Sequence, residues 1–325
     1  PPSPLLFLVP PHSPTMRSLT SYLLPWYVWY YYKPSMQSSG ALRARISRER
    51  KTKTSTPPPH LYRQFIVERR LKTLFPIYDI SPKSEAPHSC RILYLHGGNF
   101  LFDINSFHWA FVAAMAERLN AVVTVPIYPL GPEVTLYEMY DMVQPLHDEM
   151  ASCLDDDTPI FTVGDSAGAC MALVLTQRAL AEGGVASTRL VLTTPVVDSS
   201  LTNPETRRMA GADPWLGIPG IEETLRLACP GSNPKDPVIS PLYGDMTDLP
   251  PTMVLTAEYD LLSPDTRRFV KKARAHGCDI EHVEGPGMIH AWPILPFHEG
   301  YEAREAIFQW LEDACIEDAS YMSYD

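Results

Sequence analysis

The chain has 325 residues, of which 45% are hydrophobic and 20% charged, and its formal net charge is −11. This composition fits one large soluble domain with a sizeable core, and the 33 prolines argue against a coiled coil or a helical repeat. The acidic balance disfavours a nucleic-acid partner. Scattered cysteines without CxxC or metal-ligand spacing indicate reduced thiols in an intracellular, cytoplasmic protein without a metal site: Cys90, Cys153, Cys170, Cys229, Cys278 and Cys315.

An N-terminal arm, residues 1–60, differs from the body that follows, residues 61–325. Residues 1–72 carry 12 Lys/Arg against 2 Asp/Glu, whereas the remainder carries 15 against 36. The first fifteen residues precede Met16 and are rich in proline, so we expect them to be disordered or to lie outside the natural protein.

An aromatic run from Leu19 to Pro34 stands in this arm. It is too short to span a bilayer, is broken by Pro25, and lacks the cleavage pattern of a signal peptide. We expect its side chains to pack on the body and roof a pocket, with Trp26 or Trp29 near the entrance. Peripheral contact with a membrane through these aromatic residues is the alternative.

From residue 61 onward, strand and helix patterns alternate. Two early strand patterns are followed by repeated strand–helix–strand units, which indicates a mostly parallel sheet with helices on both faces. The expected strands lie at residues 65–69, 74–80, 91–97, 121–129, 159–166, 189–197, 252–260 and 279–285. The expected helices lie at residues 107–119, 136–150, 167–184, 263–277 and about 300–315. Residues of about 199–239 contain helical pieces and no strand pattern, which suits an insertion over the ligand-binding edge of the sheet.

The segment Gly164-Asp165-Ser166-Ala167-Gly168 fits G-x-S-x-G between a strand pattern and an Ala-rich helix. In that context the motif predicts a nucleophile elbow that exposes Ser166 above the sheet. A serine that attacks a carbonyl needs backbone N–H donors for the oxyanion. We expect these donors at Ala167 and, in the loop after an earlier strand, at Gly97 and Gly98.

The serine also needs a base, and the base needs an acid, in the chain order serine, acid, histidine. His290 follows the last strand pattern and a glycine-rich turn, and it is preferred to His282 within the strand and His298 near the next helix. For the acid, Asp260 ends a strand pattern, and it is preferred to Glu258 and Asp265.

These motifs together resemble the hormone-sensitive-lipase-like α/β-hydrolases over about residues 61–311, including a fungal type of esterase. The resemblance rests on His96-Gly97-Gly98, the elbow at Ser166, Asp260 in AEYDLLSPD and His290 in GMIHAWPIL. It implies an α/β-hydrolase fold with an eight-stranded, mostly parallel sheet, and a helical cap built from the arm and the insertion. The chain departs from the family pattern at Asn99, where a third glycine is usual, and at Pro129, where arginine is usual.

The resemblance further implies carboxylester hydrolysis without a cofactor, on a small-molecule ester with a short or medium acyl group, such as the acetyl ester of a sterol or secondary metabolite. We expect a pocket lined by Asn99, Phe100, Trp26, Trp29, Asp165 and Trp215. Two other hypotheses remain open: an acyltransferase or lactone-forming cyclase that uses the same acyl-enzyme, and a non-catalytic receptor on the same fold. A homodimer is compatible with the esterase and with both alternatives.

Overall fold

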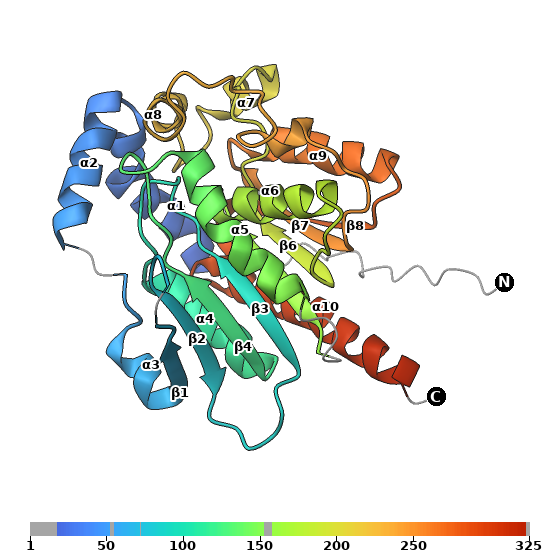
Figure 1. The fold of residues 1–325 in the computed structure, drawn as a ribbon. Coiled ribbons are helices and arrows are strands. Elements are labelled where there is room, and N and C mark those ends of the chain that lie inside the picture. The colour runs from blue at the N-terminus through green and yellow to red at the C-terminus, as the bar shows by residue number, and fades with distance from the viewer. Residues whose placement is uncertain (1–17, 53–54, 72, 153–157, 323–325) are drawn as a thin grey trace.

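The computed structural model describes residues 18–52, 55–71, 73–152 and 158–322. The prediction for the first fifteen residues lies outside these ranges. One eight-stranded sheet runs through the molecule in the order β1-β2-β4-β3-β5-β6-β7-β8 (Figure 1). The strands are β1 Phe65–Arg69, β2 Ile77–Pro82, β3 Cys90–Leu95, β4 Ala121–Pro126, β5 Ile160–Asp165, β6 Arg189–Thr193, β7 Thr252–Tyr259 and β8 Ile280–Ile289.

The sheet is antiparallel at one edge and parallel elsewhere. β2 pairs antiparallel with both β1 and β4, and all pairs from β4 to β8 are parallel. Parallel neighbours need crossover connections, and helices supply them here. Every expected strand and body helix is present, so the predicted α/β architecture is confirmed.

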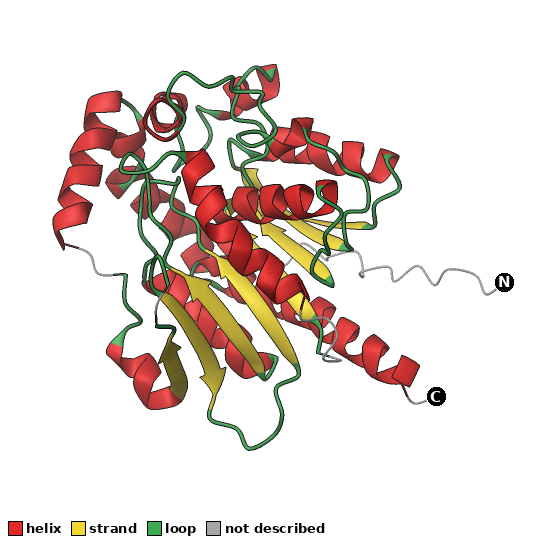
Figure 2. Ribbon diagram, in the orientation of Figure 1, coloured by secondary structure: helices red, strands yellow, loops and turns green. Residues whose placement is uncertain are grey.

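Helices cover both faces of the sheet (Figure 2). They are α1 Leu19–Tyr31, α2 Ser39–Thr52, α3 Pro59–Gln64, α4 Ser106–Arg118, α5 Leu136–Ser152, α6 Ala167–Ala181, α7 Pro204–Met209, α8 Ile218–Ala228, α9 Ser263–Ala275 and α10 His298–Met322. Successive residues of β3 point to opposite faces, as the period of a strand requires. Leu93 and Leu95 therefore join the apolar cluster with α5, α6 and α9, whereas Ile92 and Tyr94 join the cluster with α4 and α10.

Two segments far apart in sequence form a cap above the sheet. The arm supplies α1, α2 and a 3-10 turn at Lys33–Met36, and the insertion supplies α7 and α8 (Figure 1). Lys33 joins them, because its Nζ donates hydrogen bonds to the carbonyl oxygens of Ala210 (3.1 Å), Asp213 (2.7 Å) and Leu216. The described helices include none with the length and apolar content needed to cross a membrane.

Candidate active site

Ser166 stands in a strained turn between β5 and α6. Its backbone has φ 52° and ψ −115°, a conformation that costs energy for a residue with a side chain and that recurs at functional sites. The turn is crowded, since a Cβ added at Gly164 would lie 2.5 Å from the Gly168 carbonyl oxygen. A Cβ at Gly168 would lie 2.0 Å from the carbonyl oxygen of Leu95. The glycines at both ends of the pentapeptide are therefore steric requirements of this turn.

Three polar side chains form a chain of hydrogen bonds at the carboxyl ends of the strands. Oγ of Ser166 lies 2.8 Å from Nε2 of His290, and Nδ1 of His290 lies 3.0 Å from Oδ2 of Asp260. An ionised carboxylate only accepts, so Nδ1–H donates to Asp260 and Nε2 is left to accept from the serine hydroxyl. His290 follows β8 and Asp260 follows β7, and both are buried.

The surroundings of His290 favour its protonated form. Burial lowers the pKa of His290, but the charge of Asp260 and the hydrogen bond to it outweigh burial, and Asp213 and Asp165 add to their effect. The net result is a pKa above the ordinary value for histidine. This arrangement stabilises the imidazolium that forms when a base takes a proton.

The other histidines considered from sequence lie elsewhere. The side chain of His298 is 71% exposed at the start of α10, where its Nε2 lies 3.3 Å from Oε1 of Glu302. His282 is on β8, and its Nε2 lies 2.9 Å from the hydroxyl of Thr256. The structure therefore places neither of them in contact with Ser166.

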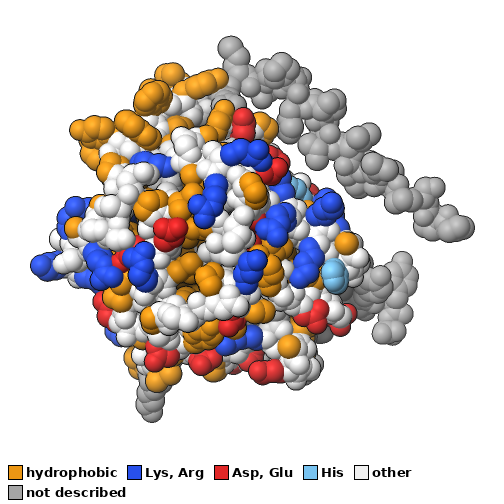
Figure 3. All heavy atoms as spheres, turned by 90° about the horizontal axis from the view of Figure 1, so that it is seen from above, with side chains coloured by type: hydrophobic (Ala, Val, Ile, Leu, Met, Phe, Trp, Pro, Cys, Tyr) orange, Lys and Arg blue, Asp and Glu red, His pale blue; other side chains and the backbone are white. Residues whose placement is uncertain are grey.

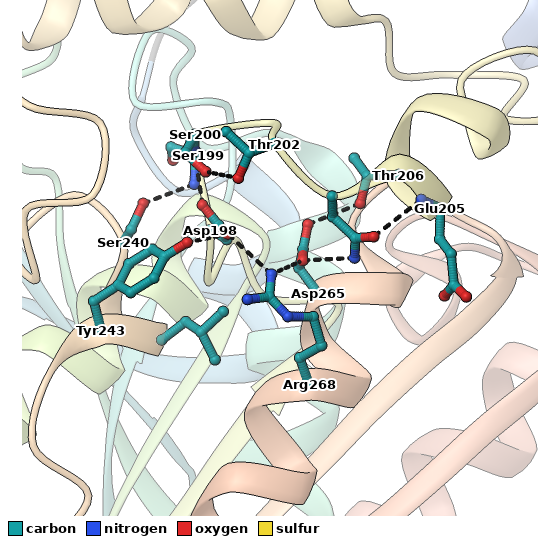
Figure 4. Close-up of polar contacts among 12 residues, drawn as sticks. Asp198, Ser199, Ser200, Thr202, Glu205, Thr206, Ser240, Tyr243, Asp265 and Arg268 are labelled. Atoms are coloured by element: carbon teal, nitrogen blue, oxygen red, sulfur yellow. Dashed lines mark hydrogen bonds and ion pairs between the residues drawn. The ribbon is translucent and has the colours of Figure 1, made fainter.

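The rival acid Asp265 belongs to a different network, which fastens the insertion to α9. Its two carboxylate oxygens accept hydrogen bonds from Asn203 and Thr206, both at 2.8 Å. Arg268 joins Asp265 (2.6 Å) to Asp198 (3.2 Å) at the start of the insertion (Figure 4). Glu258 accepts instead from the backbone N–H of Gly287 at 2.6 Å. Asp260 is the acid that contacts His290.

The structure of the loop after β3 differs from the prediction that Gly97 is an oxyanion donor. The N–H of Gly97 donates to Oδ1 of Asp165 at 2.9 Å, so it is already occupied, and assigning Gly97 as an oxyanion donor was wrong. Gly98 and Asn99 line the cavity beside Ser166, and Gly97 does not. In the part of the chain that the structure describes, the N–H groups of Gly98 and Asn99 have no backbone acceptor. Ala167 begins α6, where the first N–H groups lack intrahelical partners.

Asp165 acts as an anchor within the elbow. Besides Gly97, its carboxylate accepts from the Tyr94 hydroxyl at 2.6 Å, and it lies 3.3 Å from Nε2 of His108. Burial raises the pKa of Asp165, but the charge of His108 and these hydrogen bonds outweigh burial and hold the pKa below its ordinary value. The anion is therefore stable inside the protein and fixes the loop after β3 to the serine turn.

Asn99 joins the same loop to the cap. Its backbone has φ 57°, a left-handed conformation that asparagine tolerates better than most residues. Its Nδ2 donates to the hydroxyl of Thr224 on α8, and that hydroxyl donates to the carbonyl oxygen of Gly220 at 2.9 Å. The asparagine that replaces the usual glycine thus ties the loop after β3 to the insertion.

Ser166 and His290 open into a cavity of about 320 Å³ under the cap. Most of its lining is apolar. The residues expected there include Asn99, Phe100, Asp165 and Trp215, and all four line it.

The prediction that Trp26 and Trp29 line the pocket was wrong. They are 71% and 53% exposed and do not line the cavity, because they lie on the outer face of α1. The inner face carries Leu24, Val28 and, just beyond the helix, Tyr32, which do line it. Their spacing of four residues places them on one side of the helix. The exposed Trp26 and Tyr30 have the same spacing, so packing on the body decides which side faces inward.

No group of three or more His, Cys, Asp or Glu side chains suited to a metal ion occurs among the described residues.

The sequence alone did not identify Asp213, a buried carboxylate of the insertion that lies near the triad of Ser166, His290 and Asp260. It occurs in an irregular segment between two short helices, where no motif distinguishes it.

The chain is similar in sequence and in fold to known hydrolases. A family model described as alpha/beta hydrolase fold matches residues 92–294. An esterase of Acinetobacter venetianus is 30% identical over 207 residues, which are 63% of this chain and 68% of that protein. An acetyl-hydrolase of Streptomyces hygroscopicus is 26% identical over 233 residues, 69% of this chain and 75% of that protein. The solved structure of an esterase from the bacterial hormone-sensitive lipase family matches with a TM-score of 0.76 and 22% identity, over 93% of this chain and 100% of that one.

Proposed function

Since the chain belongs to the alpha/beta hydrolase fold family, we propose that it hydrolyses carboxylic esters with Ser166 as nucleophile, His290 as base and Asp260 as acid. The family membership confirms the resemblance to α/β-hydrolases found in the sequence. The similarity to an esterase and to an acetyl-hydrolase supports ester hydrolysis. The hydrogen-bonded chain from Ser166 through His290 to Asp260, at 2.8 and 3.0 Å, is the observation that carries the assignment of roles.

In the acylation step, Oγ of Ser166 attacks the ester carbonyl carbon while Nε2 of His290 takes the hydroxyl proton. Asp260 holds the imidazole in the required tautomer and stabilises the positive charge. When the tetrahedral intermediate collapses, the C–O bond to the alcohol breaks and His290 returns the proton to the departing alkoxide. An acyl group then remains on Ser166.

In the deacylation step, water replaces the serine as nucleophile. His290 takes a proton from the water, and the resulting hydroxide attacks the acyl carbon. The bond to Ser166 breaks, and the serine recovers its proton from His290. The products are one carboxylic acid and one alcohol for each ester and water consumed.

Both steps develop negative charge on the carbonyl oxygen. We assign its stabilisation to the backbone N–H groups of Gly98, Asn99 and Ala167. Preorganised donors of this kind are worth about 10² to 10³ in rate for each donor. Asp165 contributes indirectly, because its bond to the N–H of Gly97 holds the donor loop against the serine turn.

The lining of the cavity favours an apolar substrate with a short or medium acyl group. Phe100, Leu216, Ile221 and Leu295 are among its apolar residues. A volume of about 320 Å³ lies at the lower end of the range for small-molecule sites. The acetyl-hydrolase relative supports acetyl as one candidate acyl group.

A lipid surface is the second partner that we propose, and the outer face of α1 is where it would bind. The large side chains exposed there include Leu19, Leu23, Trp26, Trp29, Tyr30 and Tyr31. Soluble proteins rarely expose so many large apolar groups together, and Trp and Tyr favour the membrane interface. Exposed basic residues on the neighbouring α2, among them Arg43, Arg48 and Lys51, suit anionic head groups.

The position of this face relative to the cavity fits delivery of an apolar ester. Leu24 and Tyr27 line the catalytic cavity, and the same two residues line an outer groove of about 220 Å³ beside Leu23 and Pro296. Seen from above, hydrophobic side chains project at the upper left of the molecule, next to Lys and Arg side chains (Figure 3). An ester dissolved in a lipid surface would then lie close to the entrance.

Hydrolysis is tested with p-nitrophenyl esters of increasing acyl length, with Ser166→Ala as control and mass analysis of the products. We expect free carboxylic acid in a Ser166-dependent reaction, with short or medium chains preferred. Transfer of the acyl group to an added alcohol in place of water would favour the acyltransferase alternative. Absence of any Ser166-dependent product or acyl-enzyme would contradict the proposed function.

A further inference from the structure

Asp213 is a buried carboxylate of the cap that the mechanism above does not use. It lies in the insertion between α7 and α8 and is 1% exposed. A buried ionisable group requires partners, since an unpaired charge is costly to remove from water. Among the residues that the structure describes, backbone N–H groups supply the hydrogen bonds that its carboxylate accepts.

These bonds join two separate loops. Oδ1 of Asp213 accepts from the N–H groups of Trp215 and Leu216, at 2.6 and 2.8 Å. Oδ2 accepts from the N–H of Leu261 at 2.8 Å. Because Leu261 directly follows Asp260, the bond to Oδ2 fixes the backbone beside the acid of the triad.

The two bonds to Oδ1 act on the triad through Trp215. The ring of Trp215 packs edge-on against the ring of His290, with centroids 5.8 Å apart and planes at 88°. Asp213 fixes the backbone of Trp215 and so helps to hold this ring against the base. One carboxylate thus contacts the loop of the acid and supports a neighbour of the histidine.

The N-terminal arm contacts Asp213 as well. Nζ of Lys33 donates to the backbone carbonyl oxygen of Asp213 at 2.7 Å. Arm, insertion and acid loop therefore converge on a single residue. Within the described part of the chain, the ionisable groups that interact with Asp213 are Lys33, Asp260 and His290.

We propose that Asp213 is a positioning residue that fixes the insertion and the arm to the loop of Asp260. Ser166, His290 and Asp260 are then aligned only when the cap is packed on the sheet. The proposal rests on the proposed function of Ser166, His290 and Asp260. It gives the cap a role in catalysis beyond enclosing the substrate. It also predicts an electrostatic effect on the base, because the charge of Asp213 is one cause of the raised pKa of His290.

Protonation of Asp213 in mildly acidic solution would weaken the hydrogen bonds that fix the cap to the loop of Asp260. Burial and the neighbouring charge of Asp260 raise the pKa of Asp213 to about 6. Above that value the carboxylate accepts from three N–H groups. As the pH falls through it, the carboxylate gains a proton and accepts less strongly.

The test compares Asp213→Asn and Asp213→Glu with the parent, using kcat, KM and the pH profile of kcat/KM on one p-nitrophenyl ester. The amide removes the charge and turns an NH2 group toward backbone donors, so we expect kcat to fall by about 10- to 100-fold, the scale of a small misplacement. KM should change less. The acid limb should move to lower pH for Asp213→Asn, because His290 loses a neighbouring negative charge, and should remain near that of the parent for Asp213→Glu.

Glu223→Gln is the matched control. Glu223 is another fully buried carboxylate of the insertion, and it bonds to Arg43 of the arm at 2.5 Å rather than to the acid loop. We expect it to lower thermal stability and leave the midpoint of the acid limb unchanged. If Asp213→Asn keeps the kcat and midpoint of the parent, or if it loses activity only as Glu223→Gln does, the proposal is wrong. Failure of the parent to react with a serine-directed phosphonate would instead refute the proposed function.

Discussion

The backbone N–H of Gly97 donates a hydrogen bond to Oδ1 of Asp165 at 2.9 Å. Two adjacent loops are joined by this contact, the loop after β3 and the serine turn after β5. It uses the first glycine of the loop for support and leaves the next two residues, Gly98 and Asn99, beside the cavity. The side chain of Asn99 then extends to Thr224 in the cap. The donor loop is therefore held from both sides, by the elbow below and by α8 above.

Asn99→Gly should separate the backbone role of this residue from its side-chain role. Its N–H remains available, so we expect kcat on p-nitrophenyl acetate to stay within about tenfold of the parent, less than the loss of an oxyanion donor. The bond to Thr224 is lost, so KM and the preference among acyl lengths should change. Thr224→Val removes the same bond from the other side, and the double variant should add little to either single one. Fully additive effects would contradict a shared contact.

Ser166→Ala should lower kcat by about 10⁶, as in other triads that act as a unit. The change removes the nucleophile and leaves packing intact, so the melting temperature should be close to that of the parent. The measurement is ester hydrolysis at equal protein concentration, with circular dichroism to verify folding. More than about one per cent of parental activity would be incompatible with Ser166 as nucleophile.

His290→Ala should abolish acylation, since no other described histidine contacts Ser166. A phosphonate that labels the parent rapidly should label this variant very slowly. His298→Ala is the control, because His298 is exposed and lies 3.3 Å from Glu302, outside the site. If the two variants exchange these behaviours, His298 is the base and the assignment fails.

The pH profile reports the raised pKa of His290. The base must be neutral to accept a proton, so activity is present above its pKa and is lost as the pH falls through it. Because Asp260 raises that pKa, we expect the acid limb of kcat/KM to have its midpoint above the ordinary histidine value of about 6.5. Asp260→Asn should lower kcat by about 10⁴ and shift the midpoint to lower pH. An unshifted midpoint would show that Asp260 does not act on His290.

The exposed face of α1 predicts binding to lipid vesicles. The double variant Trp26→Ser/Trp29→Ser should bind vesicles with anionic head groups more weakly than the parent, measured by co-sedimentation. Hydrolysis of a water-soluble ester should be unchanged, because neither tryptophan lines the cavity. Tyr62→Ser, which removes an exposed aromatic on α3, is the control and should bind as the parent does. Equal vesicle binding by all three proteins would exclude this role for α1.

The element order and the candidate triad could be proposed from the sequence because their signals are local. Most of the strands are short runs with several β-branched residues, and the turn around Ser166 needs small residues at fixed positions two before and two after it. Asp260 and His290 stand at strand ends, and parallel strands bring such ends to one edge of the sheet. The strands and helices were confirmed, and the roles of the three residues stay predictions for the experiments above.

The oxyanion donors, the inward face of α1 and the role of Asp213 could not be predicted, because they depend on contacts between segments that are distant in sequence. Gly97 and Gly98 look equivalent in sequence, and only the approach of Asp165 from the neighbouring strand distinguishes them. The aromatic residues of the arm look alike too, but packing of α1 on the body divides them into an inner and an outer face. Asp213 has no motif at all, because its importance comes from the N–H of Leu261, 48 residues away.

Mapping of the phosphonate adduct tests directly whether Ser166 is the nucleophile. The parent protein is inactivated with a p-nitrophenyl alkylphosphonate, digested and analysed by peptide mass spectrometry, with the residual activity measured in parallel. We expect one adduct per chain, located on Ser166, with activity lost in proportion to labelling. Complete inactivation with the adduct on another residue, or full labelling of Ser166 with activity retained, would contradict this assignment.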